Sequence, residues 1–251
     1  MAIHLITKAD PILEETVDQP RRAVVLLSGG LDSATVLAIA NAEGYETYAL
    51  SFSYGQRHTV ELDAAHRVAK QLGAARHIVF DLGMRAIGGS ALTADIDVPH
   101  HDSVDDLDSS SAPITYVPAR NLIFLSVAAG WAETVGASDI FIGANALDYS
   151  GYPDCRRPFL DAFEEAATLG TVAGADGGVR FRVQAPLVDL TKAQTIQRGL
   201  DLGVDYSITH SCYDPSPAGQ ACATCDSCLL RKRGFEELDL TDPALSGSVS
   251  R

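Results

Sequence analysis

The sequence predicts an α/β protein with an open parallel sheet of about five strands, helices on both faces of the sheet and a C-terminal metal-binding segment. Three observations predict this fold. Short apolar, β-branched runs alternate with segments of helical periodicity, a glycine-rich loop joins the first run to the first helical segment, and four cysteines cluster near the end of the chain. At 251 residues the chain can bury a large core without disulfide bonds.

The first half of the chain predicts three strands, at residues 23–27, 47–52 and 77–80. Residues 23–27 read Ala-Val-Val-Leu-Leu, and so apolar a run is typical of a parallel strand covered on both faces. Helices are expected at residues 34–40, directly after the glycine-rich loop, and at residues 59–72, where apolar residues recur on one side. Strands that alternate with helices pair in parallel.

The second half continues the alternation. Residues 121–134 and 159–169 have helical periodicity, and residues 139–143 and 179–183 have strand-like composition. A further helix is expected at residues 191–202, because Thr191 is a suitable N-cap and Gly203 a suitable stop. The predicted organisation is an extension at residues 1–20, a nucleotide-binding α/β domain at residues 21–205 and a cysteine-rich helical tail at residues 206–251.

Residues 83–118 break the regular pattern. The stretch at residues 95–111 carries six aspartates and the pair His100-His101. We expect a solvated loop here that could act as a lid over a site. Without further ligands at regular spacing, the histidine pair does not predict a metal site.

Charge and hydropathy exclude several classes of function. The chain has 33 acidic and 19 basic side chains, a net charge of −14, which argues against a broad nucleic-acid interface. No apolar run reaches the roughly 18 residues that a membrane-spanning helix needs. The first 22 residues lack the basic and apolar regions of a secretory signal, so a cytoplasmic protein is expected.

The loop Ser28-Gly29-Gly30-Leu31-Asp32-Ser33 predicts a phosphate site. It follows a buried strand and opens a helix, so that backbone N–H groups and the helix N-terminus can bind an anion. Asp32 is a suitable ligand for the Mg²⁺ that accompanies nucleotide phosphates. The loop lacks the Walker A lysine and the dinucleotide fingerprint, and it resembles the pyrophosphate loop of the PP-loop ATP pyrophosphatases. ATP with Mg²⁺ is therefore the expected nucleotide, with residues 27–33 around its phosphates.

Cys212, Cys222, Cys225 and Cys228 have the spacing of a metal site, C-x(9)-C-x(2)-C-x(2)-C. Four thiolates suit one tetrahedral Zn²⁺ per chain, and because no coordination position stays open the site should be structural. An iron–sulfur cluster is the alternative, but the usual cysteine followed by proline is missing. The fifth cysteine, Cys155, lies beside arginines that could activate it as a nucleophile, although an inert loop thiol is the favoured interpretation.

Polar loops at the carboxyl ends of the predicted strands form the expected rim of a substrate crevice. The loop at residues 144–156 is the leading candidate for the acceptor, because it offers carboxylates, stacking surfaces and a cation. The candidate substrate contacts are Tyr54, Gln56, Arg57, Asp148, Tyr152, Asp154 and Arg156. Two cations elsewhere, Arg120 and Lys192, could reach the nucleotide.

Six segments together resemble the QueC family of queuosine biosynthesis, the 7-cyano-7-deazaguanine synthases. They are VVLLSGGLDS, SFSYGQRH, TYVPARN, GANALDYSGYPDCR, APLVDLTKAQT and SCYDPSPAGQACATCDSCLLRKRGF, spread over residues 22–236. The resemblance implies a Rossmann-like fold of the adenine nucleotide alpha hydrolase type. It also implies a carbon–nitrogen ligase that uses ATP and ammonia to convert 7-carboxy-7-deazaguanine into a nitrile through adenylated acid and amide intermediates.

Carried over by motif, the catalytic residues are Asp32, Ser33 and Lys192, and the nucleotide contacts are Leu27, Ser28, Gly29, Gly30, Leu31, Asp32, Ser33 and Arg120. The four clustered cysteines hold Zn²⁺, and family members suggest a homodimer. The sequence departs from the family pattern at Ala119, where glycine is expected, and in the extension at residues 1–20.

Three other functions remain open at this point. A tRNA thiolation enzyme of the same ATP-using group would employ Cys155 as a sulfur carrier, but the acidic charge balance opposes it. An amide-forming synthetase of the NAD or GMP type shares the phosphate loop but gives no reason for four clustered cysteines. A zinc-ribbon interaction module without catalysis conflicts with the intact loop and Asp32.

Overall fold

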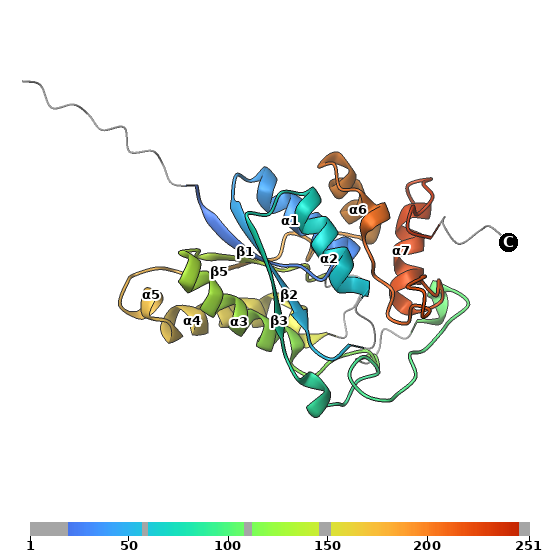
Figure 1. Ribbon diagram of the computed structural model, residues 1–251, viewed down its shortest axis with the longest axis horizontal. Helices are drawn as coiled ribbons and strands as arrows, with labels where there is room; N and C mark the ends of the chain where they lie inside the picture. Colours follow the sequence, from blue (N-terminus) through green and yellow to red (C-terminus); the bar gives the residue numbers. More distant parts are fainter. Residues whose placement is uncertain (1–19, 57–59, 108–111, 146–151, 246–251) are drawn as a thin grey trace, which may run out of the picture.

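The computed structural model describes residues 20–56, 60–107, 112–145 and 152–245. Five parallel strands form one sheet in the order β3-β2-β1-β4-β5 (Figure 1). The strands are β1 (Arg22–Leu26), β2 (Glu46–Ser53), β3 (Arg76–Asp81), β4 (Asp139–Phe141) and β5 (Arg182–Gln184). The predicted fold class is therefore confirmed.

Helices cover both faces of the sheet (Figure 1). The helices are α1 (Leu31–Ala42), α2 (Val60–Gln71), α3 (Arg120–Val135), α4 (Arg157–Gly170), α5 (Val172–Ala175), α6 (Lys192–Asp201) and α7 (Asp226–Glu236). Alternate side chains of β1 point to opposite faces: Val24 and Leu26 enter the core formed with α3 and α4, whereas Ala23 and Val25 enter the core formed with α1, α2 and α6. This two-sided burial explains the uninterrupted apolar sequence of β1.

Three elements differ from the sequence-based expectation. Helix α1 begins at Leu31, three residues before the predicted start, because Gly30 adopts the extended N-cap conformation. Strand β5 lies at Arg182–Gln184, since Arg182 pairs with Asp139 of β4. Strand β3 is an edge strand whose Val79 and Phe80 are 50% and 41% exposed. Within the described residues, no helix is long and apolar enough to span a membrane.

The segment between β3 and α3 is more ordered than a solvated loop. It contains two 3₁₀ turns, η1 (Met84–Ala86) and η2 (Val104–Asp106), and it buries Leu92 and Val98 in the core. Within the described part of residues 95–111 the aspartates are exposed, as expected for a solvated loop, whereas Val98 is buried and anchors the stretch.

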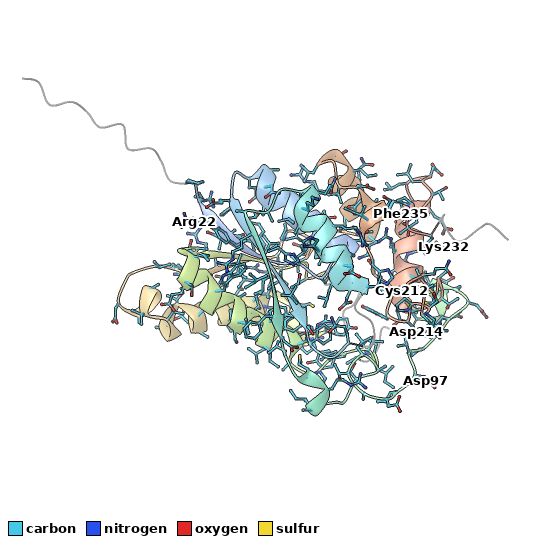
Figure 2. The ribbon with its side chains drawn as sticks, viewed as in Figure 1. Arg22, Asp97, Cys212, Asp214, Lys232 and Phe235 are labelled. Carbon is cyan, nitrogen blue, oxygen red and sulfur yellow. The ribbon has the colours of Figure 1, made fainter. Side chains whose placement is uncertain are left out.

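His100 and His101 form hydrogen bonds between this segment and the cysteine-rich tail. His100 Nδ1 lies 2.7 Å from Thr224 Oγ1, and His100 Nε2 lies 3.0 Å from Asp214 Oδ2. The His101 backbone N–H donates to the carbonyl of Thr224. Figure 2 shows Cys212 and Asp214 beside α7, with Asp97 of the acidic segment close by. The two histidines thus have structural partners, as expected for residues outside a metal site.

The cysteine-rich tail packs closely on the α/β unit. A Cβ atom built on Gly234 of α7 would lie 2.5 Å from Cγ of Lys192 on α6. Only glycine permits this approach, so α7 supports the side chain of Lys192 directly. The domain boundary between residues 205 and 206 stays a prediction.

Candidate active site

The candidate site lies where the strand order reverses. Strands β1 and β4 are neighbours, and the chain leaves them toward opposite edges of the sheet. Their carboxyl ends carry the loop at residues 27–33 and the residues Gly143 and Ala144, and a cavity of about 250 Å³ opens between them. Open α/β sheets bind ligands at such a switch point.

The phosphate loop forms one wall of this cavity. Gly30 provides no side-chain cap for α1, and Ser28 and Ser33 hold each other, with their Oγ atoms 3.1 Å apart. Ser33 Oγ also donates to the carbonyl of Gly30, and Ser28 N donates to Ser33 Oγ. The loop is therefore pre-shaped around a helix N-terminus whose N-cap residue has no side chain, which is favourable for binding an anion.

Gly29 cannot be replaced without moving α2. Its φ angle is +86°, and a Cβ atom there would lie 2.3 Å from the carbonyl oxygen of Glu61 and 2.5 Å from the backbone nitrogen of Ala65. The phosphate loop and the first turn of α2 thus pack backbone to backbone. This contact explains the glycine and fixes α2 relative to the loop.

Lys192 reaches the same loop from α6. Its Nζ atom donates to both carboxylate oxygens of Asp32, at 2.7 and 2.9 Å. The lysine is the first residue of α6, and Thr191 is the N-cap of that helix, as the sequence predicts; the structure adds a capping box between Thr191 and Gln194. The Lys192 side chain is only 10% exposed and lines a second, smaller cavity of about 120 Å³ together with Asp32.

Glu61, a residue that sequence reasoning missed, faces the first cavity. It lies in the first turn of α2, where the charge of Arg120 and the side chain of Gln56 act on its carboxyl group, and where it acts in turn on Tyr54. Burial raises the pKa of Glu61 to about 7, against smaller lowering effects of Arg120 and Gln56. Its position five residues after Gln56, in the first turn of the helix that follows this rim loop, was the only available signal.

Aromatic residues line the same cavity. The rings of Phe52 and Phe124 are stacked, with centroids 3.8 Å apart and planes 10° apart, and Tyr54 packs edge-on against Phe124. These residues come from β2, its following loop and α3. They give the cavity an apolar wall in addition to the phosphate loop, suitable for a planar heterocycle.

The four clustered cysteines can hold one metal ion. The Sγ atoms of Cys212, Cys222, Cys225 and Cys228 lie within 4.8 Å of one another. A tetrahedron with metal–sulfur bonds of about 2.3 Å has sulfur–sulfur edges of about 3.8 Å, so the arrangement fits. Backbone N–H groups of Cys222, Cys225 and Tyr213 donate to sulfur atoms of the cluster, which suits thiolates.

Residues just before the first cysteine bind the phosphate loop. His210 N donates to the carbonyl of Gly29 at 2.8 Å, and Leu31 N donates to Ser211 Oγ at 3.1 Å. The buried guanidinium of Arg231 on α7 donates to Thr209 and to Asp242, which closes the tail around this segment. Hydrogen bonds therefore connect the segment that carries the first clustered cysteine to the phosphate loop.

The predicted substrate residues differ in whether they line the larger cavity, the smaller cavity or neither. Tyr54 and Gln56 line the larger cavity, and Tyr152 lines the smaller one. Asp154 is not among the residues that line either cavity, because its Oδ2 accepts from Asn121 N in the first turn of α3. Arg156 is exposed and also outside both linings. The predicted contacts Arg57 and Asp148 lie outside the described residues.

The remaining cysteine lies in a wall of both cavities. Burial, with a further contribution from the Asp154 carboxylate, raises the pKa of Cys155 to about 11. Asn121 Nδ2 lies 3.3 Å from its sulfur. The thiol is therefore protonated at neutral pH, which supports the inert interpretation over a nucleophile.

Comparison with known proteins identifies the family. The family described as "Queuosine biosynthesis protein QueC" matches residues 22–239. The chain belongs to the QueC family.

Curated relatives agree with this membership over almost their whole length. A protein named 7-cyano-7-deazaguanine synthase from Syntrophotalea carbinolica is 62% identical over 224 residues, which are 89% of this chain and 96% of the relative. One of the same name from Geobacter sulfurreducens is 62% identical over 223 residues, 89% of this chain and 92% of the relative.

The structure also explains the departure from the QueC pattern at Ala119. This residue is the N-cap of α3 and has a left-handed conformation, with φ +54° and ψ +24°. Glycine adopts such angles without strain, whereas an L-residue pays roughly 1–2 kcal/mol. The alanine therefore strains the turn that positions Arg120.

Proposed function

We propose that the chain is a 7-cyano-7-deazaguanine synthase that converts 7-carboxy-7-deazaguanine, ammonia and ATP into the nitrile. The observation that carries this proposal is the convergence of the phosphate loop and an aromatic wall on one cavity, in a chain of the QueC family. The cavity would hold the ATP phosphates over the loop and the planar deazaguanine against Phe52 and Phe124. Ligase chemistry in this family is consistent with that arrangement.

The chemistry would run in two rounds at one loop. In the first, the substrate carboxylate attacks the α-phosphorus of ATP, pyrophosphate leaves, and ammonia then displaces AMP to give the amide. In the second, the amide oxygen attacks another ATP, and loss of AMP leaves the nitrile. The first turn of α1 at Asp32 and Ser33, together with the hydroxyl groups of Ser28 and Ser33, would hold the leaving pyrophosphate in both rounds.

Asp32, Ser33 and Lys192 would serve the reacting phosphates. Lys192 would turn from Asp32 to the phosphates when ATP binds, and Asp32 would then be free to hold the Mg²⁺ that neutralises their charge. Arg120, the only cation in the larger cavity's described lining, would contact the nucleotide or the substrate carboxylate. Tyr54, Gln56, Arg57, Asp148 and Tyr152 remain proposed substrate contacts.

The cysteine cluster is proposed to hold one structural Zn²⁺ per chain. Four protein ligands leave no position for water, so the ion would contribute folding free energy rather than chemistry. The cluster borders the nucleotide cavity only through Cys212. Elemental analysis that finds one zinc and no iron supports this assignment, and bound iron overturns it.

The remaining partners follow the same reasoning. We propose free ammonia or a partner enzyme as the nitrogen source and a homodimer as the assembly, for which the exposed apolar side chains of edge strand β3 are one available surface. A cytoplasmic location would keep the five free cysteines reduced.

The direct test incubates the protein with 7-carboxy-7-deazaguanine, ammonium and ATP and identifies products by mass spectrometry. The expected products are the amide, then the nitrile, with AMP and pyrophosphate. The Asp32→Ala variant should release no pyrophosphate. If no deazaguanine product forms while another carboxylate is consumed, the proposed substrate is wrong.

A further inference from the structure

We propose that the Glu61 carboxylate is the proton acceptor of the ligation, taking the proton that ammonia loses as its nitrogen bonds to the activated carbon. This assignment rests on the proposed function and adds to it the base that the reaction needs. It is carried by the position of Glu61 in the cavity wall and by the groups that surround it.

The backbone of Glu61 is fixed against the phosphate loop. A Cβ atom built on Gly29 would lie 2.3 Å from the carbonyl oxygen of Glu61, so the two backbones are in close contact. The residue lies in the first turn of α2, and its side chain lines the same cavity as Ser28, Asp32 and Arg120. A carboxylate therefore stands in the reaction cavity without belonging to the phosphate loop.

The neighbours of Glu61 orient its carboxylate. Gln56 is itself held, because its Oε1 accepts from Tyr54 N at 2.7 Å and its Nε2 donates to the Phe52 carbonyl at 3.2 Å. From this position the Gln56 side chain favours the ionised form of the Glu61 carboxyl and so lowers its pKa. Among the described residues, the charged or titratable groups that act on Glu61 are Arg120 from α3 and Tyr54 from the end of β2.

The surroundings of Glu61 also give its carboxylate the basicity that proton transfer from ammonia requires. Burial raises the pKa of the Glu61 carboxyl to about 7, so at neutral pH it can both take up and release a proton. Ordinary exposed carboxylates are too weakly basic for this task. Arg120 and Gln56 limit the rise and keep a useful fraction ionised.

The proton balance requires such a group. When ammonia attacks the acyl-adenylate, a C–N bond forms, the C–O bond to AMP breaks, and the nitrogen must lose one proton to become a neutral amide. In the second round the activated amide loses AMP and the protons on nitrogen as the C≡N bond forms. Glu61 accepts the single proton that nitrogen loses in the first round. Of the two protons that nitrogen loses in the second round, Glu61 accepts one and the phosphate of the leaving AMP accepts the other, and Glu61 returns its proton to water between steps.

Other groups of the described cavity are less suitable. Asp32 is neutralised by Lys192, and the Cys155 thiol is protonated at neutral pH. His210 lines the cavity but belongs to the segment whose backbone binds Gly29. His210 is thus the alternative base that the experiment must distinguish.

The experiment compares Glu61→Gln with wild type in two separate assays. Pyrophosphate–ATP exchange with 7-carboxy-7-deazaguanine alone reports adenylation, and amide formation after addition of ammonium reports the transfer. Glu61→Gln should keep exchange within about threefold of wild type but slow amide formation about 100-fold, the usual size of a general-base effect. At constant free ammonia, wild-type transfer should fall below about pH 7, and Glu61→Gln should lose this dependence.

Matched variants separate this role from a structural one. Asp63→Asn removes an exposed carboxylate from the same helical turn and should leave both assays unchanged. Glu61→Asp should recover part of the transfer rate. The proposal is overturned if Glu61→Gln slows exchange and transfer equally, if it slows neither, or if His210→Gln alone removes the pH dependence. Wild type that forms no amide would instead contradict the proposed function.

Discussion

Lys192 Nζ lies 2.7 and 2.9 Å from the two carboxylate oxygens of Asp32, although 160 positions separate the residues in sequence. The pair joins the N-terminal turns of α1 and α6 at the edge of the cavity. Gly234 of α7 permits the close packing that holds the lysine stem. The contact therefore connects the phosphate loop, helix α6 and the tail beyond the cysteines.

Replacing this lysine tests its role in charge neutralisation. Lys192→Met keeps the apolar stem but removes the ammonium group, and we expect pyrophosphate release to fall about 100-fold, as when one transition-state donor is lost. Lys232→Met, an exposed change on α7, is the control and should retain the wild-type rate. Equal rates for all three proteins would contradict a role in catalysis.

The remaining cysteine offers a test of the sulfur-carrier alternative. Cys155→Ser should leave nitrile formation within about threefold of wild type, because a buried, protonated thiol supplies no nucleophile. Product formation by mass spectrometry is the measurement. Complete loss of turnover in a variant that still binds ATP would favour a covalent thiol mechanism.

The strained turn before α3 predicts a stabilising substitution. Ala119→Gly should raise the free energy of unfolding by about 0.5 kcal/mol, because relief of the left-handed strain exceeds the added chain entropy of glycine. Ala162→Gly on the exposed face of α4 should lower it by about 1 kcal/mol. Urea unfolding measures both, and a destabilised Ala119→Gly variant would refute the strain argument.

The raised pKa of Glu61 predicts how stability depends on pH. Burial raises this pKa from 4.5 to about 7, so the folded protein binds the proton more tightly than the unfolded chain. The resulting stabilisation is complete below about pH 4.5 and is lost as pH rises through about 7, amounting to at most about 3 kcal/mol.

Unfolding free energies at pH 5 and pH 8 measure this effect when wild type and Glu61→Gln are compared. The free energy of unfolding should fall more between pH 5 and pH 8 in wild type than in Glu61→Gln. The comparison cancels the contribution of the cysteines, which is common to both proteins. Identical pH dependence in the two proteins would show that Glu61 titrates normally.

Metal removal should affect the nucleotide site through the backbone. Cys222→Ser should lower metal content and Tm, and because His210 and Ser211 bind the phosphate loop, it should also weaken ATP binding. Cys155→Ser is the matched control and should keep its metal. Loss of metal with unchanged Tm would mean that the cluster does not stabilise the fold.

Much of the fold followed from local sequence patterns. The apolar strand β1 and the N-cap Thr191 of α6 are local features, so composition and spacing predicted them. The order of the strands in the sheet needs long-range pairing, and the edge position of β3 could not be derived from its apolar sequence. The histidine contacts with Thr224 and Asp214 are equally non-local.

The site was predicted less completely than the fold. The residue types and spacing of the phosphate loop and of the cysteine cluster were enough to predict what each binds. In the structure, His210 and Ser211, which precede the first cysteine of the cluster, form hydrogen bonds with the phosphate loop. Asp154 looked like a substrate contact because it is polar and lies in a rim loop, but its side chain binds the first turn of α3. Glu61 was missed because its significance arises from burial beside Arg120 and Tyr54, which a helical pattern does not reveal.

The stoichiometry of the reaction with ¹⁵N-ammonium tests the proposed two-round ligation most directly. The account predicts one ¹⁵N atom in the nitrile and two AMP molecules per nitrile formed, with ¹⁵N-amide as the species that appears first. One AMP per product with no conversion of amide to nitrile would contradict it and would leave an amide-forming synthetase.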